Sequence, residues 1–277
     1  MPVRKIQSRQ NAQLKVLSRA LNARRQKELR FVGIEGPHLV EEAIRAHLKI
    51  VSIFVGDTMQ RWSRQMSLPT ETEVLIMPSG VLSGILGTET PQPVAALIEP
   101  PEWSWAHLLG ARERAVLVIV LAGVQDPGNL GTILRSAEAF GATGVVSLPG
   151  TASAWNPKSV RASAGSVFRV PLVAAGERRC FEQLREAGVK ILATTVRAAQ
   201  PVDLVDLSGS VALVIGNEGN GVADDLVAKA DAKITIPCPG PVESLNAAVA
   251  AGVLLYEAAR QRAAAGGGPA NHRGARR

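Results

Sequence analysis

Three polar segments in the second half of the chain place amide, carboxylate and hydroxyl side chains directly after apolar runs. The first segment, 122–135, contains Asn129 and Arg135 and follows the run 115–121. The second, 214–221, reads Gly-Asn-Glu-Gly-Asn-Gly from residue 216, with Glu218 as its only carboxylate. The third, 236–246, has three prolines and one glycine, and its last three residues include Ser244 and Asn246. Loops at the carboxyl ends of parallel strands are the usual ligand sites of open α/β sheets, so these segments predict a small-molecule site.

Each segment also has a purely structural interpretation when it is taken alone. The first is compatible with an ordinary strand-turn-helix connection, with Pro127 near the helix start. The second is compatible with a simple turn, and Ser244 in the third is well placed as a helix N-cap. The second segment lacks the dinucleotide fingerprint, because Glu218 occupies the place of the second glycine, and no Gly-Lys-Ser/Thr follows it. A dinucleotide-dependent oxidoreductase is therefore disfavoured.

The elements that must position these segments form two α/β domains. In residues 1–100, strands at 31–34, 50–55, 74–77 and 94–98 alternate with helices at 11–24, 37–46 and 59–66 and one further short helix. The prolines at 100 and 101 open a predicted linker, 101–112. In residues 113–264, continuous apolar runs at 115–121, 144–148, 191–194 and 211–215 predict a parallel sheet. Helices are expected at 130–140, 158–164, 180–187, 223–230 and 245–262, and residues 265–277 are expected to be a disordered tail.

Charge and composition favour a partner with phosphate groups. The chain carries a formal net charge of +7, and its first thirty residues hold nine basic side chains against the single acid Glu28. This run is compatible with a solvated helix face, or with a surface that neutralises phosphates. An aromatic content of 4% favours recognition by backbone charge over base stacking.

Two separated cysteines and four histidines without ligand spacing predict neither a disulfide framework nor a metal site. No apolar run is long enough to span a bilayer, which predicts a cytoplasmic protein.

Together the three segments resemble the signature motifs of the SpoU/TrmH family of RNA ribose 2′-O-methyltransferases, within the SPOUT superfamily. Asn129, Gly131 and Arg135 match the block N-x-G-x-x-x-R, residues 216–221 match G-N-E-G-x-G, and residues 236–246 match I-P-x-x-G-x-V-E-S-L-N. The resemblance covers about residues 113–262. Cys238 departs from it, since methionine is common there, and so do Ala247 and Ala248, which replace a bulkier pair. Residues 33–36 and 39–42 look like the family's substrate-binding domain, which is similar to kink-turn-binding ribosomal proteins.

The resemblance implies a deep trefoil knot in the C-terminal domain, S-adenosylmethionine as cofactor, and a homodimer that pairs through the knot region and the last helix. It implies a catalytic set of Arg135, Asn129, Glu218, Ser244 and Asn246. The implied cofactor-binding residues are Thr194, Thr195, Ile215, Gly216, Asn217, Gly221, Ile236, Pro237, Ser244, Leu245 and Asn246. RNA contacts are expected from Arg9, Arg19, Arg24, Arg25, Arg135, Arg161 and Arg169, the last two from the stretch R-x-S-x-G-x-x-F-x-x-P at 161–171.

The substrate implied by the resemblance is structured RNA, most often 23S ribosomal RNA for relatives with this domain layout. Transfer RNA is the alternative substrate, and a catalytically silent RNA-binding relative is the alternative function. Arg135 is described in the family as a general base, but a guanidinium holds its proton too tightly for that role. We therefore expect Arg135 to bind the phosphate of the target nucleotide and to stabilise the developing alkoxide.

Overall fold

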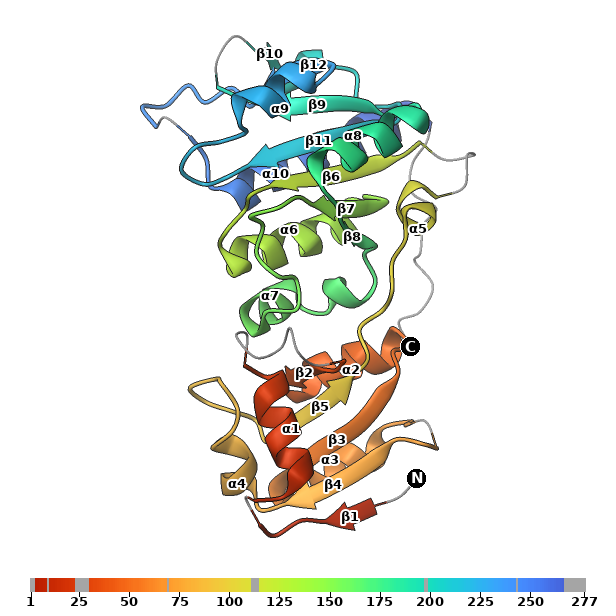
Figure 1. Ribbon diagram of the computed structural model, residues 1–277, viewed down its shortest axis with the longest axis vertical. Helices are drawn as coiled ribbons and strands as arrows, with labels where there is room; N and C mark the ends of the chain where they lie inside the picture. The colour runs from red at the N-terminus through yellow and green to blue at the C-terminus, as the bar shows by residue number, and fades with distance from the viewer. Residues whose placement is uncertain are drawn as a thin grey trace. The chain divides into compact units, whose positions relative to one another are not determined.

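The computed structural model describes residues 3–8, 10–22, 30–68, 70–110, 115–196, 199–242 and 244–266. The chain divides into two compact units (Figure 1). The N-terminal unit comprises Met1–Glu102 together with Ser153–Arg169, and the C-terminal unit comprises Trp103–Ala152 and Val170–Arg277. Segment 153–169 was expected in the domain 113–264, so its membership of the N-terminal unit differs from the predicted division.

The N-terminal unit is built on a mixed sheet with the strand order β1-β4-β3-β5-β2. Its strands are β1 (Val3–Lys5), β2 (Val32–Glu35), β3 (Ile50–Gly56), β4 (Glu73–Met77) and β5 (Val94–Ile98). Its helices are α1 (Ala12–Ala20), α2 (Pro37–Arg45), η2 (Asp57–Met59), α3 (Gln60–Gln65), α4 (Ser79–Ser83), α7 (Pro157–Ser163) and η3 (Ser166–Phe168). Leu14 and Leu17 of α1 are buried with Phe54 and Leu75 of the sheet, which confirms the amphipathic helix.

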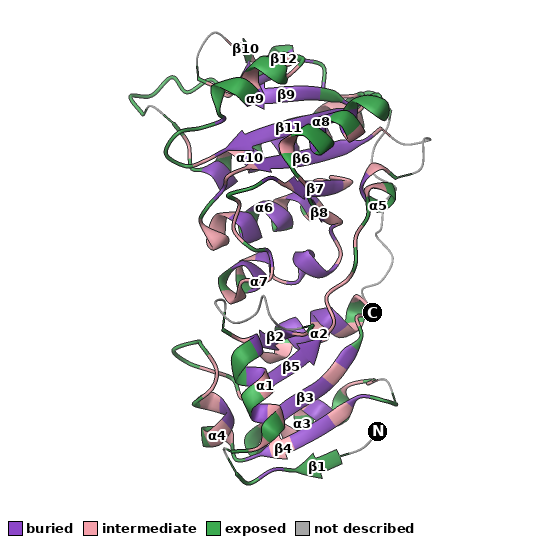
Figure 2. Ribbon diagram, viewed as in Figure 1, coloured by how far each residue is buried: buried purple, intermediate pink, exposed green. Residues whose placement is uncertain are grey.

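The C-terminal unit is built on a parallel sheet with the order β10-β12-β9-β11-β6-β7-β8. Its strands are β6 (Leu117–Ala122), β7 (Gly144–Ser147), β8 (Leu172–Ala174), β9 (Lys190–Thr194), β10 (Gln200–Pro201), β11 (Val211–Gly216) and β12 (Ala232–Thr235). Its helices are α5 (Trp105–Leu109), α6 (Pro127–Ala139), α8 (Glu177–Glu186), η4 (Val202–Leu204), α9 (Asp224–Lys229) and α10 (Ala247–Ala264). The predicted parallel sheet is confirmed, and its central strands are buried (Figure 2).

The faces of this sheet are covered by different helices. Val118 and Val120 of β6 pack with residues of α5, α8 and α9, among them Leu108 and Leu184. Alternate residues of the strands point to the other face, where α6 packs on β7 and α10 packs on both α6 and β11. As a consequence α6, which begins within the first polar segment, and α10, which follows the third, lie side by side.

Four short strands were not predicted: β1, β8, β10 and β12. The predicted linker 101–112 contains α5, whose capping box joins Ser104 and His107. Leu108 of α5 is buried in the core of the C-terminal unit, and Trp103, Trp105 and Leu109 are partly buried against that core. The predicted disordered tail from residue 267 onward lies outside the described residues. Within the described part of the chain, no helix is long and apolar enough to cross a membrane.

Candidate active site

The first polar segment folds into a turn and the first turn of α6. Gly123 turns the chain after β6 with φ of 78°, a value that glycine adopts without strain. Asp126 then caps the helix, because its carboxylate accepts a hydrogen bond of 2.9 Å from the backbone N–H of Asn129. Pro127 occupies the first turn, where its missing N–H is tolerated. Asn129 is thereby fixed at the carboxyl end of β6.

The second polar segment is a closed loop that begins where β11 ends. The backbones of Asn217 and Gly221 exchange hydrogen bonds of 3.0 and 2.9 Å. The Asn217 side chain accepts from the N–H of Gly219 at 2.9 Å and donates to the Gly123 carbonyl at 2.9 Å. A Cβ atom on Gly216 would lie 2.0 Å from the carbonyl carbon of Gly221, so only glycine fits there. This loop presents Glu218 toward the first segment.

The third polar segment leads into α10, and its helix cap differs from the sequence prediction. Ser244 was expected to cap the helix, but α10 begins at Ala247 and its N-cap is Asn246. The side-chain Oδ1 of Asn246 accepts from the N–H groups of Ala248 at 2.9 Å and Val249 at 3.3 Å. Ser244 precedes that cap by two residues and is exposed.

Asn129 joins the three segments through its amide group. Its Nδ2 donates to Glu218 Oε1 at 2.9 Å, and its Oδ1 accepts from Asn246 Nδ2 at 3.0 Å. The backbone N–H groups of Gln125 and Asp126 donate to the same carboxylate at 3.2 and 3.3 Å. The first and second segments are about ninety residues apart in the chain, and the second and third are about thirty apart, yet all three meet here. We call the group formed by Asn129, Glu218 and Asn246 the amide cluster.

The Glu218 carboxylate is held in its ionised form. Burial raises its pKa, but hydrogen bonds from the Asn129 side chain and from backbone N–H groups outweigh that effect and leave the pKa below its ordinary value. Both of its oxygens are already acceptors within the cluster. Glu218 is consequently suited to binding the loops together and poorly suited to accepting a proton at neutral pH.

The expected cofactor-binding residues lie at the carboxyl ends of neighbouring strands. Thr194 is the last residue of β9, and its hydroxyl donates to the Val214 carbonyl at 2.8 Å. The N–H of Thr195 donates to the Ile234 carbonyl at 2.9 Å. Ile215 and Gly216 are buried at the end of β11. Ile236 and Leu245 are half-buried, and Pro237 is exposed. Because β9, β11 and β12 are adjacent in the sheet, these residues share one edge with the amide cluster.

The arginines expected to bind RNA have different environments. Arg135 on α6 and Arg19 on α1 are exposed, and Arg135 has neither a hydrogen bond nor an ion pair with any described residue. Arg161 and Arg169 are ion-paired with Glu35 and Glu42, at 2.6 and 2.7 Å. Sequence analysis identified these two arginines and missed their carboxylate partners. The remaining candidates, Arg9, Arg24 and Arg25, lie outside the described residues.

Among the described residues, no three or more histidine, cysteine, aspartate or glutamate side chains are grouped so that they could hold a metal ion. The amide groups and the carboxylate of the amide cluster are already hydrogen-bonded to one another, which is an arrangement for holding loops together.

A parallel sheet with polar loops gathered at the carboxyl ends of its strands defines an α/β ligand-binding domain. Residues 116–256 match the SpoU rRNA Methylase family model, and residues 11–96 match the model of the MRM3-like substrate binding domain. This protein belongs to the SpoU rRNA methylase family.

Relatives and solved structures agree with that assignment. The chain is 36% identical to the 23S rRNA (guanosine(2553)-2′-O)-methyltransferase RlmP of Bacillus subtilis (strain 168), over 92% of this chain and 98% of that protein. It is similar to the AdoMet-bound rRNA methyltransferase from Sinorhizobium meliloti, with a TM-score of 0.81, 31% identity, and coverage of 93% and 98%. It is also similar to the SpoU methyltransferase AviRb from Streptomyces viridochromogenes in complex with AdoMet, with a TM-score of 0.82, 29% identity, and coverage of 92% and 99%.

Proposed function

We propose that this protein transfers a methyl group from S-adenosylmethionine to a ribose 2′-hydroxyl of 23S ribosomal RNA. The observation that carries the proposal is the amide cluster, in which Asn129 bonds at once to Glu218 and Asn246. The cluster brings together the three motifs of the methylase family at one edge of the parallel sheet. The names of the relatives support 23S ribosomal RNA as the substrate.

The residues at this edge fit S-adenosylmethionine. Gly216 lets backbone approach backbone closely, and the helices α6 and α10 both begin at the amide cluster. Backbone groups of Gly216, Ile236 and Leu245 would hold the cofactor, with Thr194 and Thr195 beside it. When bound, the cofactor supplies an electrophilic methyl group on a sulfonium.

The protein's own contribution is orientation and charge stabilisation. Methyl transfer needs the ribose oxygen, the methyl carbon and the sulfur nearly in line, and fixed loops supply that alignment. Arg135 binds the phosphate of the target nucleotide and stabilises the alkoxide as it forms, while the proton passes to phosphate or water. Glu218 is not the base, because its pKa is lowered and its oxygens are engaged. Asn129, Glu218 and Asn246 hold the loops, and Ser244 lies in the third of them.

A methylation assay tests the substrate assignment. 23S ribosomal RNA and transfer RNA from a strain that lacks this protein are incubated with the enzyme and radiolabelled S-adenosylmethionine, and 2′-O-methylated positions are then mapped. We expect one ribose of 23S ribosomal RNA to be labelled. Labelling of transfer RNA alone would establish the alternative substrate, and cofactor binding without labelling of either RNA would contradict the proposed activity.

The variant Arg135→Lys tests the mechanism. We expect activity to fall about a hundredfold or more, since lysine cannot reproduce the planar, two-pronged contact of a guanidinium with phosphate. A pH-rate profile is the measurement. Near-normal turnover of the lysine variant at high pH would show that the guanidinium is not required.

The proposal includes a cytoplasmic homodimer whose subunits pair along α10. Val249, Val253 and Tyr256 follow one another at helical spacing on α10, with exposures of 52%, 37% and 56%, and Val242 in the preceding loop is 57% exposed. Side chains of this kind on one helix face favour a protein partner, and a second copy is the partner that the family suggests. The trefoil knot is part of the same proposal and is supported by family membership.

A further inference from the structure

Segment 153–169 is fastened to the N-terminal unit by ion pairs at two of its arginines. The first pair joins Arg161 on α7 to Glu35 on β2, with 2.6 Å between Nη1 and Oε1. The Glu35 side chain is only 5% exposed, and its other oxygen accepts a hydrogen bond of 2.7 Å from the N–H of Gly87. A buried carboxylate needs such partners, because an unpaired charge in a protein interior is strongly unfavourable.

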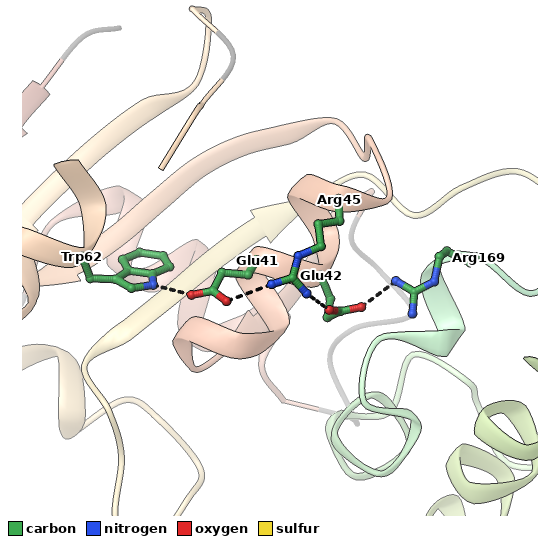
Figure 3. A network of polar contacts seen from close by, with 5 residues as sticks. All are labelled: Glu41, Glu42, Arg45, Trp62 and Arg169. Atoms are coloured by element: carbon green, nitrogen blue, oxygen red, sulfur yellow. Dashed lines mark hydrogen bonds and ion pairs between the residues drawn. The ribbon is translucent and has the colours of Figure 1, made fainter. Parts of the chain in front are cut away.

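The second pair belongs to a longer polar network (Figure 3). Arg169 donates to Glu42 Oε2 at 2.7 Å, and Arg45 binds the other oxygen of the same carboxylate. Arg45 also bonds to Glu41 at 3.2 Å, and Glu41 accepts from the indole N–H of Trp62 at 2.7 Å. Glu42, whose side chain is 11% exposed, therefore lies between two guanidinium groups and is held from both sides.

Packing around the second pair also requires this docked position. Gly165 has φ of 94°, and a Cβ on it would lie 2.7 Å from Cβ of Glu42, so the backbone of the segment rests directly on that side chain. Phe168 is buried, and its ring is stacked on Trp155 with a centroid distance of 6.4 Å. The arginines at 161 and 169 and the glycine at 165 are thus explained by docking, whereas Phe168 packs on Trp155 within the segment.

We propose that Glu35 and Glu42 are positioning residues, which hold segment 153–169 in place for RNA binding. Arg161 and Arg169 bind these two carboxylates within the protein and do not bind RNA phosphates. This inference rests on the proposed function as an RNA methyltransferase. It replaces the expectation that both arginines bind RNA directly. The docked segment completes the N-terminal unit, so loss of either carboxylate has the same effect on RNA binding as loss of its arginine.

A double-mutant cycle distinguishes the two roles. Affinity for in vitro transcribed 23S ribosomal RNA is measured at several salt concentrations for Glu42→Gln, Arg169→Gln and the double variant. We expect each single change to weaken binding about tenfold, the double change to be no worse, and the salt dependence to stay unchanged. Affinity for S-adenosylmethionine should equal that of the wild type. The same cycle applies to Glu35 and Arg161.

The opposite pattern would overturn the inference. If Arg169 binds a phosphate, Glu42→Gln leaves RNA affinity intact or raises it, and Arg169→Gln lowers the slope of log K against log salt by about 0.7 to 0.9. Arg178→Gln on α8 is the matched control for loss of one positive charge, because Arg178 is 91% exposed and, among the described residues, is paired with Glu182, another exposed side chain on its helix. That control should leave RNA affinity unchanged.

Hydrogen exchange gives a readout that needs neither RNA nor activity. In Glu42→Gln and Arg169→Gln, amides of residues 166–169 should exchange at least about tenfold faster than in the wild type, since the docked segment opens more often. Exchange at wild-type rates in both variants would overturn the anchoring role. Faster exchange would support anchoring even if methylation of 23S ribosomal RNA failed, which separates this inference from the proposed function.

Discussion

Asn129 has the side chain that the centre of the site requires. A carboxamide carries a donor and an acceptor on the same rigid group, so one residue can donate to a carboxylate and accept from a second amide. Aspartate has the same shape but cannot donate, and it would place a second negative charge beside Glu218. The hydrogen bonds to Glu218 and Asn246 therefore explain the residue type at position 129.

Replacement of Glu218 tests whether it binds the loops together. Glu218→Gln keeps the size of the side chain but removes the charge that accepts from Asn129 and from two backbone N–H groups. Glutamine keeps one acceptor oxygen, so only the bond from the Gln125 N–H to the other oxygen is necessarily lost. A hydrogen bond to a charged group contributes about 1.5 to 3 kcal/mol, so we expect kcat/KM to fall about ten- to a hundredfold. Steady-state kinetics measures this, and Glu186→Gln on the surface of α8 is the control.

The pH dependence of the same variant follows from the pKa of Glu218. Because the pKa is lowered in the folded protein, the carboxylate stabilises the fold at every pH above the ordinary glutamate pKa, and this contribution is lost as pH falls through the lowered value. The difference in unfolding free energy between wild type and Glu218→Gln should stay constant from about pH 9 to pH 6 and shrink below about pH 4. Urea unfolding measures it. A difference that changes between pH 6 and pH 8 would assign it to another group.

The two cysteines should differ sharply in reactivity. Burial raises the pKa of the Cys180 thiol to about 12, and the reactive species is the thiolate. Cys238 is exposed in the third polar segment. Iodoacetamide at pH 8 should therefore alkylate one thiol per native chain and two in denaturant, and mass spectrometry should locate the first at Cys238. Alkylation of native Cys180 at a comparable rate would contradict its burial.

At the scale of elements, the periodicity of apolar residues located the strands and helices that have long apolar patterns. The strands β6, β7, β9 and β11 and the helices α6 and α10 were located because their patterns extend over several turns or a full buried strand. The strands β8, β10 and β12 have two to four residues and too little pattern to identify. The cap of α10 was assigned two residues early, since both Ser244 and Asn246 are good capping residues and only the fold decides between them.

The loop after β11 provides a test at this scale. Gly216→Ala places a methyl group 2.0 Å from the Gly221 carbonyl carbon, a backbone atom that cannot rotate away. We expect the loop to be displaced, affinity for S-adenosylmethionine to fall at least about tenfold, and the free energy of unfolding to fall by about 1 to 3 kcal/mol. Calorimetric titration and urea unfolding measure the two effects.

Gly219→Ala in the same loop is the matched control. Its added Cβ would lie 3.4 Å from Asn217 Oδ1, an ordinary contact distance. This variant should bind the cofactor with wild-type affinity. Equal behaviour of the two variants would mean that the closeness of Gly216 to Gly221 does not shape the cofactor site.

At the scale of the whole molecule, sequence predicted two α/β domains but could not assign segment 153–169 to the N-terminal unit. The contacts that place it there join Arg161 to Glu35 and Arg169 to Glu42, residues 126 and 127 positions apart. No local pattern encodes such pairs. The amide cluster is equally non-local, and it was predicted because the family motifs are distinctive, a kind of information that periodicity does not contain.

The exposed face of α10 gives the prediction that belongs to the whole molecule. A stripe of Val249, Val253 and Tyr256 is unfavourable in water and becomes favourable when a second copy covers it. Wild type should have about twice the chain mass of 29.2 kDa in light scattering, and Val249→Glu should be a monomer, because a buried unpaired carboxylate costs more than the interface gains. Val3→Glu, at an equally exposed valine of the N-terminal unit, should stay dimeric. A dimeric Val249→Glu protein would place the subunit interface on another surface.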